Sequence, residues 1–190
     1  MRIKIGVSAR HVHLSKEDFE ILFGKNKTLT KLRDLYRPGE FAANETLTLQ
    51  TEKAEIKGVR IIGPLRKETQ IEISKTDAYM LGLNPPIRNS GDLLGSEAIT
   101  LVSEKAQVYK PYGCIIATRH VHVRKEDIAK YDWDNNKKVR VRLFGEKGGI
   151  IENVYVREEN DTNFELHIDL DDANAFLVNH GDEAEILPDE

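Results

Sequence analysis

The most restrictive feature of this sequence is a histidine motif that occurs twice. Residues 8–18 read S-A-R-H-V-H-L-S-K-E-D and residues 117–127 read A-T-R-H-V-H-V-R-K-E-D. Over residues 8–19 and 117–128, seven of the twelve aligned positions are identical. Four of the six histidines of the chain lie in these two copies. The duplication predicts two related structural units that share one kind of histidine site.

The residues around each copy predict a strand before the motif and a helix after it. Apolar, β-branched runs at residues 4–8 and 113–117 are typical of strands. In the first copy Ser15, followed by Asp18, predicts a helix N-cap. The second copy places Arg124 at the cap position, so the start of its helix is less well specified.

A second repeat lies further along each half. Q-I-E-I-S-K-T-D-A (residues 70–78) aligns with E-L-H-I-D-L-D-D-A (residues 165–173), which places Glu72 opposite His167. Both segments alternate apolar and polar residues, which predicts strands with one polar face. We expect a helix after each strand, capped near Thr76 or Asp171 and ending at Gly82 or around residues 179–181.

Further strands are expected at residues 45–50, 59–62, 98–102, 139–143, 150–156 and 183–187. Many short strands with few short helices indicate β-barrels. We therefore predict a mainly β protein of two barrel domains, related by internal duplication and capped by short α-helices. Residues 24–43 have no counterpart in the second half and are interpreted as an insertion.

Composition excludes several classes of protein. The net charge of −4 and pI near 5.9 argue against binding nucleic acid or a membrane through the overall field. Cys114 is the single cysteine, so the chain has neither an intrachain disulfide nor a cysteine-rich zinc site. The first residues, M-R-I-K-I-G-V, resemble neither a signal peptide nor a spanning segment. We expect a cytoplasmic protein.

The histidine motifs are candidate metal ligands. Side chains at i and i+2 of an extended chain project to the same side, so each pair can offer two imidazoles to one ion. A catalytic zinc ion takes a third protein ligand and keeps a position open. The repeated strand supplies that ligand, which is Glu72 in the first half and His167 in the second. One isolated His-x-His is more often an ordinary surface or core pair, and the duplication is what favours metal binding. The candidate ligands are His11, His13, Glu72, His120, His122 and His167.

Arginines form a second set of candidates. Arg66 follows a Gly-Pro turn and lies six residues before Glu72, so it can face the same site and bind phosphate or carboxylate. The turn around Ser90 can offer a hydroxyl and backbone donors to an anion, although a plain turn explains it equally well. Any single arginine is more commonly a surface charge. The candidate substrate-binding residues are Arg10, Arg88, Ser90 and Arg119, beside the catalytic candidate Arg66.

The chain resembles the PduL-type phosphotransacylases, the phosphate propanoyltransferase family. The resemblance rests on V-S-A-R-H-V-H-L-S, G-P-L-R-K-E-T-Q-I-E-I-S-K-T-D-A, P-I-R-N-S-G, A-T-R-H-V-H and E-L-H-I-D-L-D-D-A-N-A, which span most of the chain. In the second motif V-H-V-R replaces the V-H-M-S that family members usually carry, which affects the helix cap and no ligand. The chain also starts directly at the first strand, without the N-terminal extension that directs many relatives into bacterial microcompartments. We therefore expect a free bacterial cytoplasmic enzyme, with microcompartment association as the alternative.

The resemblance implies an acyltransferase that interconverts acetyl-CoA or propanoyl-CoA plus inorganic phosphate with acyl phosphate plus coenzyme A. It implies two zinc ions per chain, with the active site between two barrels. His11, His13 and Glu72 would hold the ion that meets the coenzyme A sulfur, and the three later histidines the more open one. Arg66 matches the phosphate-contacting arginine. Residues 1–9 with 118–190 would form one barrel, and residues 10–117, with the insertion at about 24–44, the other.

Two other functions fit the same residues. A zinc-dependent hydrolase would use the two metals to activate water against a thioester or an acyl phosphate. A non-catalytic metal-binding or coenzyme A-binding module would use them for recognition alone. Acyl-chain preference is open at this point. We expect a homodimer or higher homo-oligomer, with no nucleic-acid or membrane partner.

Overall fold

The structure is a computed structural model that describes residues 1–35, 37–134, 137–159 and 164–188. The chain forms two compact units. Unit 1 combines Met1–Ala9 with Thr118–Glu190, and unit 2 is Arg10–Ala117. No helix among the described residues is both long and apolar enough to cross a bilayer.

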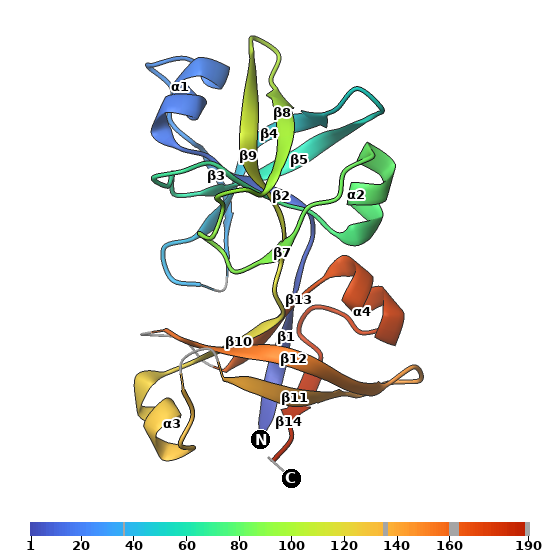
Figure 1. Cartoon of the computed structure of the whole chain (residues 1–190). Coiled ribbons are helices and arrows are strands. Elements are labelled where there is room, and N and C mark those ends of the chain that lie inside the picture. The colour runs from blue at the N-terminus through green and yellow to red at the C-terminus, as the bar shows by residue number, and fades with distance from the viewer. Residues whose placement is uncertain (36, 135–136, 160–163, 189–190) are drawn as a thin grey trace. The chain divides into compact units, whose positions relative to one another are not determined.

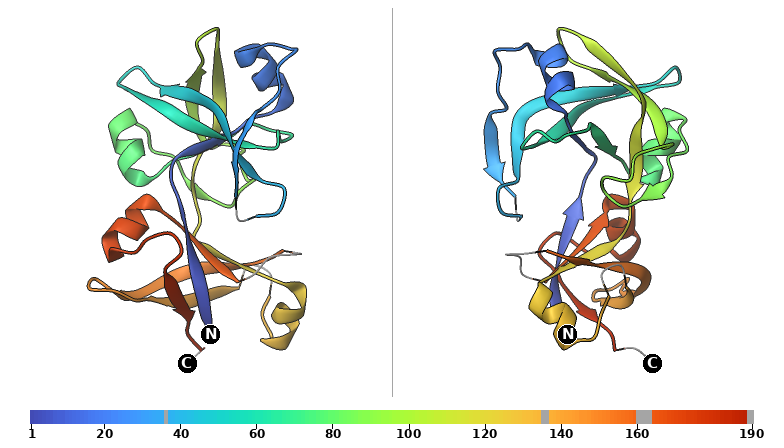
Figure 2. Two further views of the ribbon diagram at one scale, coloured as in Figure 1. Left: turned by 180° about the vertical axis from the view of Figure 1, so that it is seen from behind. Right: turned by 60° about the vertical axis from the view of Figure 1, so that its left-hand side comes forward.

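Unit 1 is a closed barrel in which the strands follow the order β1-β13-β10-β12-β11-β14, and β14 pairs with β1 to close it. The bounds are Arg2–Ser8 (β1), His120–Val123 (β10), Lys138–Leu143 (β11), Gly149–Glu158 (β12), Glu165–Asp169 (β13) and Glu183–Ile186 (β14). Figure 2 shows β14, in dark red, beside β1, in blue. Ile5, Val121 and Leu166 are completely buried in the barrel core. Helices α3 (Lys125–Lys130) and α4 (Leu170–Phe176) belong to this unit.

Unit 2 closes in the same way, through pairings that run β9-β6-β2-β5-β4-β8 and return to β9. The bounds are His11–His13 (β2), Phe41–Gln50 (β4), Glu55–Gly63 (β5), Gln70–Glu72 (β6), Glu97–Val102 (β8) and Gln107–Ala117 (β9). Two short strands are added outside this ring: β3 (Lys31–Asp34) on β4 and β7 (Ile87–Arg88) on β9. Helices α1 (Lys16–Phe23) and α2 (Lys75–Leu81) flank the barrel (Figure 1).

The two barrels have equivalent strand pairings. β10 is antiparallel to β13 and parallel to β12, just as β2 is antiparallel to β6 and parallel to β5. β13 is in turn parallel to β1, and β6 to β9. The prediction of a mainly β protein with two barrels related by duplication is therefore confirmed.

The strand before each motif pairs with strands of the unit that does not contain the motif. β1 leads into His11 and His13 but pairs with β13 and β14 of unit 1. β9 leads into His120 and His122 but pairs with β6 and β8 of unit 2. Each barrel is thus completed by a strand that sequence repetition alone assigns to the other half.

Unit 2 has longer connections than unit 1 both before β4 and between α2 and β8. β3, which is exposed along its length, falls inside the segment interpreted as an insertion. The final residues of that segment, 41–44, are the first residues of the barrel strand β4. Residue 36 of this segment lies outside the described residues.

Helix starts differ from the prediction by two residues. α2 is capped by Ser74, not Thr76, and α4 by Asp169, not Asp171, because each cap accepts a hydrogen bond from the backbone of the aspartate three residues later. The predicted end at Gly82 is right for α2, whereas α4 ends earlier, at Leu177. The predicted Ser15 cap of α1 is confirmed, and α3 has no side-chain cap at Arg124.

Candidate active site

The barrel register of unit 1 brings three histidines together. β10 pairs His120 directly with His167 of β13, and His122 lies two residues further along β10. One ligand atom from each of the three side chains falls within 4.8 Å of the others. His120 and His122 approach through their Nε2 atoms, which are 3.1 Å apart.

Groups outside the cluster hold these rings in orientation. The Nδ1 atom of His120 lies 2.8 Å from the carbonyl oxygen of Thr118, and that of His122 lies 2.6 Å from the Glu159 carboxylate. The carbonyl oxygen of Thr118 can only accept, so Nδ1 of His120 carries the proton and its lone pair is left on Nε2, inside the cluster. The carboxylate beside His122 favours the same tautomer. Hydrogen bonding of this kind sets the tautomer of metal-binding histidines.

Unit 2 has an equivalent group in which a carboxylate replaces the third histidine. β2 pairs His11 with Glu72 of β6, the register that His120 and His167 adopt in unit 1. The Nε2 atoms of His11 and His13 lie 3.6 and 3.9 Å from the two carboxylate oxygens of Glu72. The ligand atoms of the three side chains again fall within 4.8 Å of one another.

The electrostatics of both groups favour metal-binding protonation states. Burial, reinforced by the positive charges of His11 and Arg66, lowers the pKa of His13 well below its usual value. Burial and the nearby Arg157 do the same for His120. Burial alone would raise the pKa of Glu72, but the imidazoles of His11 and His13 outweigh it and the pKa falls. Neutral imidazoles and an ionised carboxylate are the forms that bind metal ions.

The donor sets fit zinc. Two histidines with one glutamate, and three histidines, are ligand sets that catalytic zinc sites use while leaving a position for water or substrate. Neither group contains the cysteine set of a closed structural site, since Cys114 is completely buried in the core of unit 2. The residues present therefore suit a metal that works on a substrate.

A polar network connects Arg66 to Glu72, one of the three candidate metal ligands of unit 2. Its Nη1 donates to Ser90 Oγ (3.1 Å) and its Nη2 to Glu40 Oε1 (3.0 Å). Gln70 Nε2 lies within hydrogen-bond distance of both Ser90 Oγ and a carboxylate oxygen of Glu72, while Gln70 Oε1 accepts from the backbone of Gly91. The network places a guanidinium fork and the carboxylate of a candidate metal ligand on one polar surface.

The other predicted arginines have carboxylate partners. Arg10 donates to Asp77 Oδ1 from Nε (2.9 Å), and Arg119 donates to both carboxylate oxygens of Asp172. Each aspartate is the third residue of the helix that follows the ligand strand, so these arginines connect the histidine motif to that helix. Arg88, on β7, donates to Asp92 (3.3 Å).

Sequence reasoning missed the residues that orient the ligands. Gln70 and Glu165 lie two residues before Glu72 and His167, and Asp77 and Asp172 lie five residues after them. Both pairs fall inside the second repeat, so their constant offset from the ligands was an available signal. Glu40, Glu159 and Arg157 lie outside the repeats and are found only through the fold.

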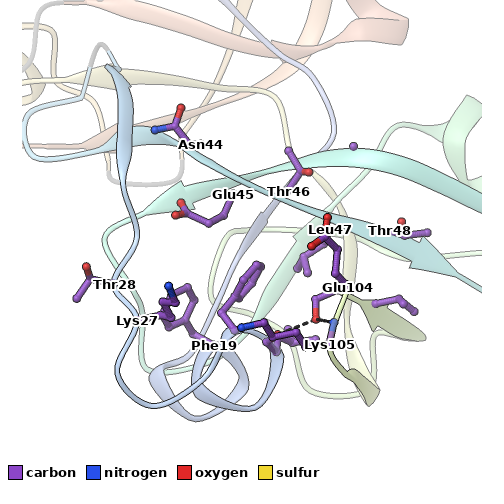
Figure 3. A pocket seen from close by; sticks show the side chains of 15 residues that line it. Phe19, Lys27, Thr28, Asn44, Glu45, Thr46, Leu47, Thr48, Glu104 and Lys105 are labelled. Atoms are coloured by element: carbon purple, nitrogen blue, oxygen red, sulfur yellow. Dashed lines mark hydrogen bonds between the residues drawn. The ribbon is translucent and has the colours of Figure 1, made fainter.

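A pocket of about 610 Å³ lies elsewhere in unit 2. It is bordered by Phe19 of α1, by Glu45 and Leu47 of β4, and by Lys105 in the turn between β8 and β9 (Figure 3). Its lining includes none of the candidate ligands and none of the candidate arginines, so we do not assign the chemistry to it.

The chain is similar to known proteins over most of its length. The family model described as phosphate propanoyltransferase matches residues 4–179. The chain is 45% identical over 181 residues to a Thermotoga maritima protein named phosphate propanoyltransferase, covering 95% of this chain and 86% of the relative. A Priestia megaterium protein of the same name is 48% identical over 180 residues, with 95% and 83% covered. A Rhodobacter capsulatus protein of that name is 45% identical over 174 residues, with 92% and 81% covered.

Proposed function

Because this chain belongs to the phosphate propanoyltransferase family, we propose that it transfers a short-chain acyl group between coenzyme A and inorganic phosphate with the help of two zinc ions. The family match makes the chain an acyltransferase of the phosphotransacylase type. The zinc part of the proposal is supported above all by the two three-donor groups, which occupy the same register positions in two barrels.

The reaction requires a phosphate oxygen to attack the thioester carbonyl carbon, with the carbon–sulfur bond breaking and the thiolate leaving. Phosphate already carries the nucleophilic oxygen, so we assign no separate general base. We assign phosphate orientation to Arg66, because a guanidinium presents two parallel donors that match two oxygens of one anion. Ser90, hydrogen-bonded to Arg66, adds a hydroxyl at the same place.

In this proposal His11, His13 and Glu72 hold one zinc ion, and His120, His122 and His167 hold the other. Bound zinc supplies Lewis acidity that polarises a carbonyl and stabilises a departing thiolate. Gln70 keeps the Glu72 carboxylate turned toward the two imidazoles. Burial lowers the pKa of His13 and of His120, which favours the neutral imidazole with a free lone pair. Thr118 and Glu159 direct the Nε2 atoms of His120 and His122 into the cluster.

The decisive experiment follows acyl-CoA consumption with and without phosphate, and traps acyl phosphate as the hydroxamate. We expect consumption to require phosphate and to yield one acyl phosphate per coenzyme A released. A hydrolase would consume acyl-CoA without phosphate, and a binding module would consume none. A series of acyl-CoA chain lengths, run before and after chelation, measures the acyl preference and the metal requirement together.

Metal analysis of variants tests the ligand assignment separately. His11→Ala and His167→Ala should each lose one of two zinc equivalents. His180→Ala is the matched control, because this histidine contacts the backbone of Val7 outside both groups. Wild-type zinc content in either ligand variant would show that the ion is held elsewhere.

A further inference from the structure

In each ligand strand an acidic residue pairs with a histidine of the motif, but the two acidic residues occupy different positions. In unit 2, β6 pairs Glu72 with His11 and Gln70 with His13. In unit 1, β13 pairs His167 with His120 and Glu165 with His122. Glu165 therefore occupies the position of Gln70, and His167 that of Glu72. Glu165 therefore lies two residues before the position that corresponds to Glu72, on the same face of the strand, and is next to the third candidate ligand position.

Glu165 is buried and directed at its neighbouring ligand. Its exposure is 3%, and its Oε2 atom lies 2.7 Å from Nε2 of His167. Gly6, on β1, pairs with His167 and leaves the space that the carboxylate fills. A Cβ atom added at Gly6 would lie 3.0 Å from Glu165 Cδ. The barrel is thus shaped around this side chain.

A buried carboxylate is unfavourable unless charge or hydrogen bonding compensates it. The equivalent position in unit 2 shows that a neutral glutamine fits this register. Three neutral imidazoles bring no negative charge to a divalent ion, whereas the set in unit 2 brings one through Glu72. Carboxylates that accept hydrogen bonds from metal-binding histidines fix the ring and raise its basicity.

We propose that Glu165 is a positioning carboxylate of the three-histidine metal site. It orients His167, while Glu159 lies against His122, and it adds negative charge beside a set that, unlike the set with Glu72, has no carboxylate among its ligands. The inference rests on the proposed function, because it requires a metal ion at His120, His122 and His167. Glu165 acts through His167 and is not itself a ligand.

The test is metal titration of the full-length chain in a His11→Ala background, which leaves the three-histidine set as the site measured. Zinc is titrated against a chromophoric chelator, and cobalt(II) reports coordination through its visible absorption. Glu165→Gln should weaken binding by about 10- to 100-fold while the stoichiometry stays at one ion. Glu183→Gln is the matched control, since it removes one carboxylate of unit 1 that pairs with Arg2 at the surface. That control should bind as the background does.

A second variant separates charge from misfolding. The double variant Glu165→Gln, His167→Glu gives β13 the same residues that β6 has at Gln70 and Glu72. It should restore the metal affinity that Glu165→Gln loses. Unchanged affinity in Glu165→Gln overturns the proposal. Complete loss of the ion in Glu165→Gln, as expected for His167→Ala, would also overturn the proposal, because it would mean that Glu165 is itself a ligand. If the His11→Ala background binds no metal at all, the proposed function fails at this site before Glu165 is tested.

Discussion

Arg119 donates to both carboxylate oxygens of Asp172, from Nε at 2.7 Å and from Nη2 at 2.5 Å. Arg10 makes the corresponding ion pair with Asp77 in unit 2. The hydrogen bond to Asp172 raises the pKa of Arg119, which stays charged. Since Arg119 precedes His120 and Asp172 lies in the helix after His167, the pair holds two ligand-bearing segments together.

Replacing Arg119 with Ala should therefore weaken metal binding at the three-histidine set by about tenfold, in the range of other residues that support metal ligands. Arg119→Lys should be intermediate, because it keeps the charge and loses the fork. Chelator competition measures both. Arg124→Ala, which breaks a more exposed ion pair with Asp127 in the same unit, is the control. Equal weakening in the control would point to a general loss of stability.

Arg66→Ala should raise the KM for phosphate by about 10- to 100-fold, because hydrogen bonds to charged groups contribute about 1.5 to 3 kcal/mol. The KM for acyl-CoA should change much less. Arg66→Lys retains the charge without the two parallel donors and should recover part of the loss. Steady-state kinetics with each substrate varied in turn provide the measurement, and equal effects on both substrates would contradict the role assigned to Arg66.

Glu40 forms an ion pair with the Arg66 guanidinium, the group that we propose binds phosphate. Glu40→Gln should lower the KM for phosphate by up to about fivefold, the change expected when a partly exposed ion pair worth about 0.2 to 1 kcal/mol is removed. The same assay compares it with Glu45→Gln, whose carboxylate binds Thr30 instead. A raised KM in Glu40→Gln would mean that the carboxylate positions Arg66 for phosphate and does not compete with it.

Because of Asp18, the free energy of unfolding should decrease at acid pH. Burial would raise its pKa, but hydrogen bonds from Lys110, Thr69 and Ser15 outweigh burial and lower it. A depressed folded-state pKa contributes stability above the unfolded pKa of about 4, and this contribution is lost as the pH falls through the folded value. Asp18→Asn should cost about 1 to 3 kcal/mol in free energy of unfolding at pH 7.

Urea unfolding at pH 7 and at pH 3 checks this prediction. The difference between wild type and Asp18→Asn should shrink at the lower pH. Glu17→Gln, which changes the exposed neighbouring acid on the same helix, should differ little from wild type at either pH. A constant difference for Asp18→Asn would mean that the carboxylate charge is not what stabilises unit 2.

Cys114 should be unreactive in the folded protein. It has no exposed surface, and burial with the nearby Glu97 raises the pKa of its thiol to about 12. Because the thiolate is the reacting form, alkylation at pH 7 should be more than about a thousandfold slower than for a free thiol. Mass spectrometry after iodoacetamide treatment, with a denatured sample as control, measures the rate. Rapid labelling under native conditions would show that unit 2 opens readily.

The sequence by itself predicted most of the barrel strands, the mainly β class and the two candidate ligand sets, but not β3 or β7. Strand alternation and the His-x-His spacing are local properties that one segment displays without its neighbours. The repeat then aligned Glu72 with His167, and the structure places these two residues at the same register position in two barrels. The two helices begin two residues earlier than predicted, because Ser74 and Asp169 are the residues that accept from the backbone N–H groups of Asp77 and Asp172.

The sequence pattern alone did not decide which strand completes which barrel, which only the family resemblance implied, and the tertiary structure alone shows which side chains orient the candidate ligands. β1 and β9 precede the motifs in sequence, yet they pair with strands of the other half, because backbone hydrogen bonding depends on which edges are free in the folded chain. For the same reason Glu40 meets Arg66, Asp172 meets Arg119, and Glu159 meets His122. These contacts join residues that are distant or irregularly spaced in sequence, so no local period predicts them. The histidine motif identifies the candidate ligands, and the long-range strand pairing of the barrels determines how these side chains are held.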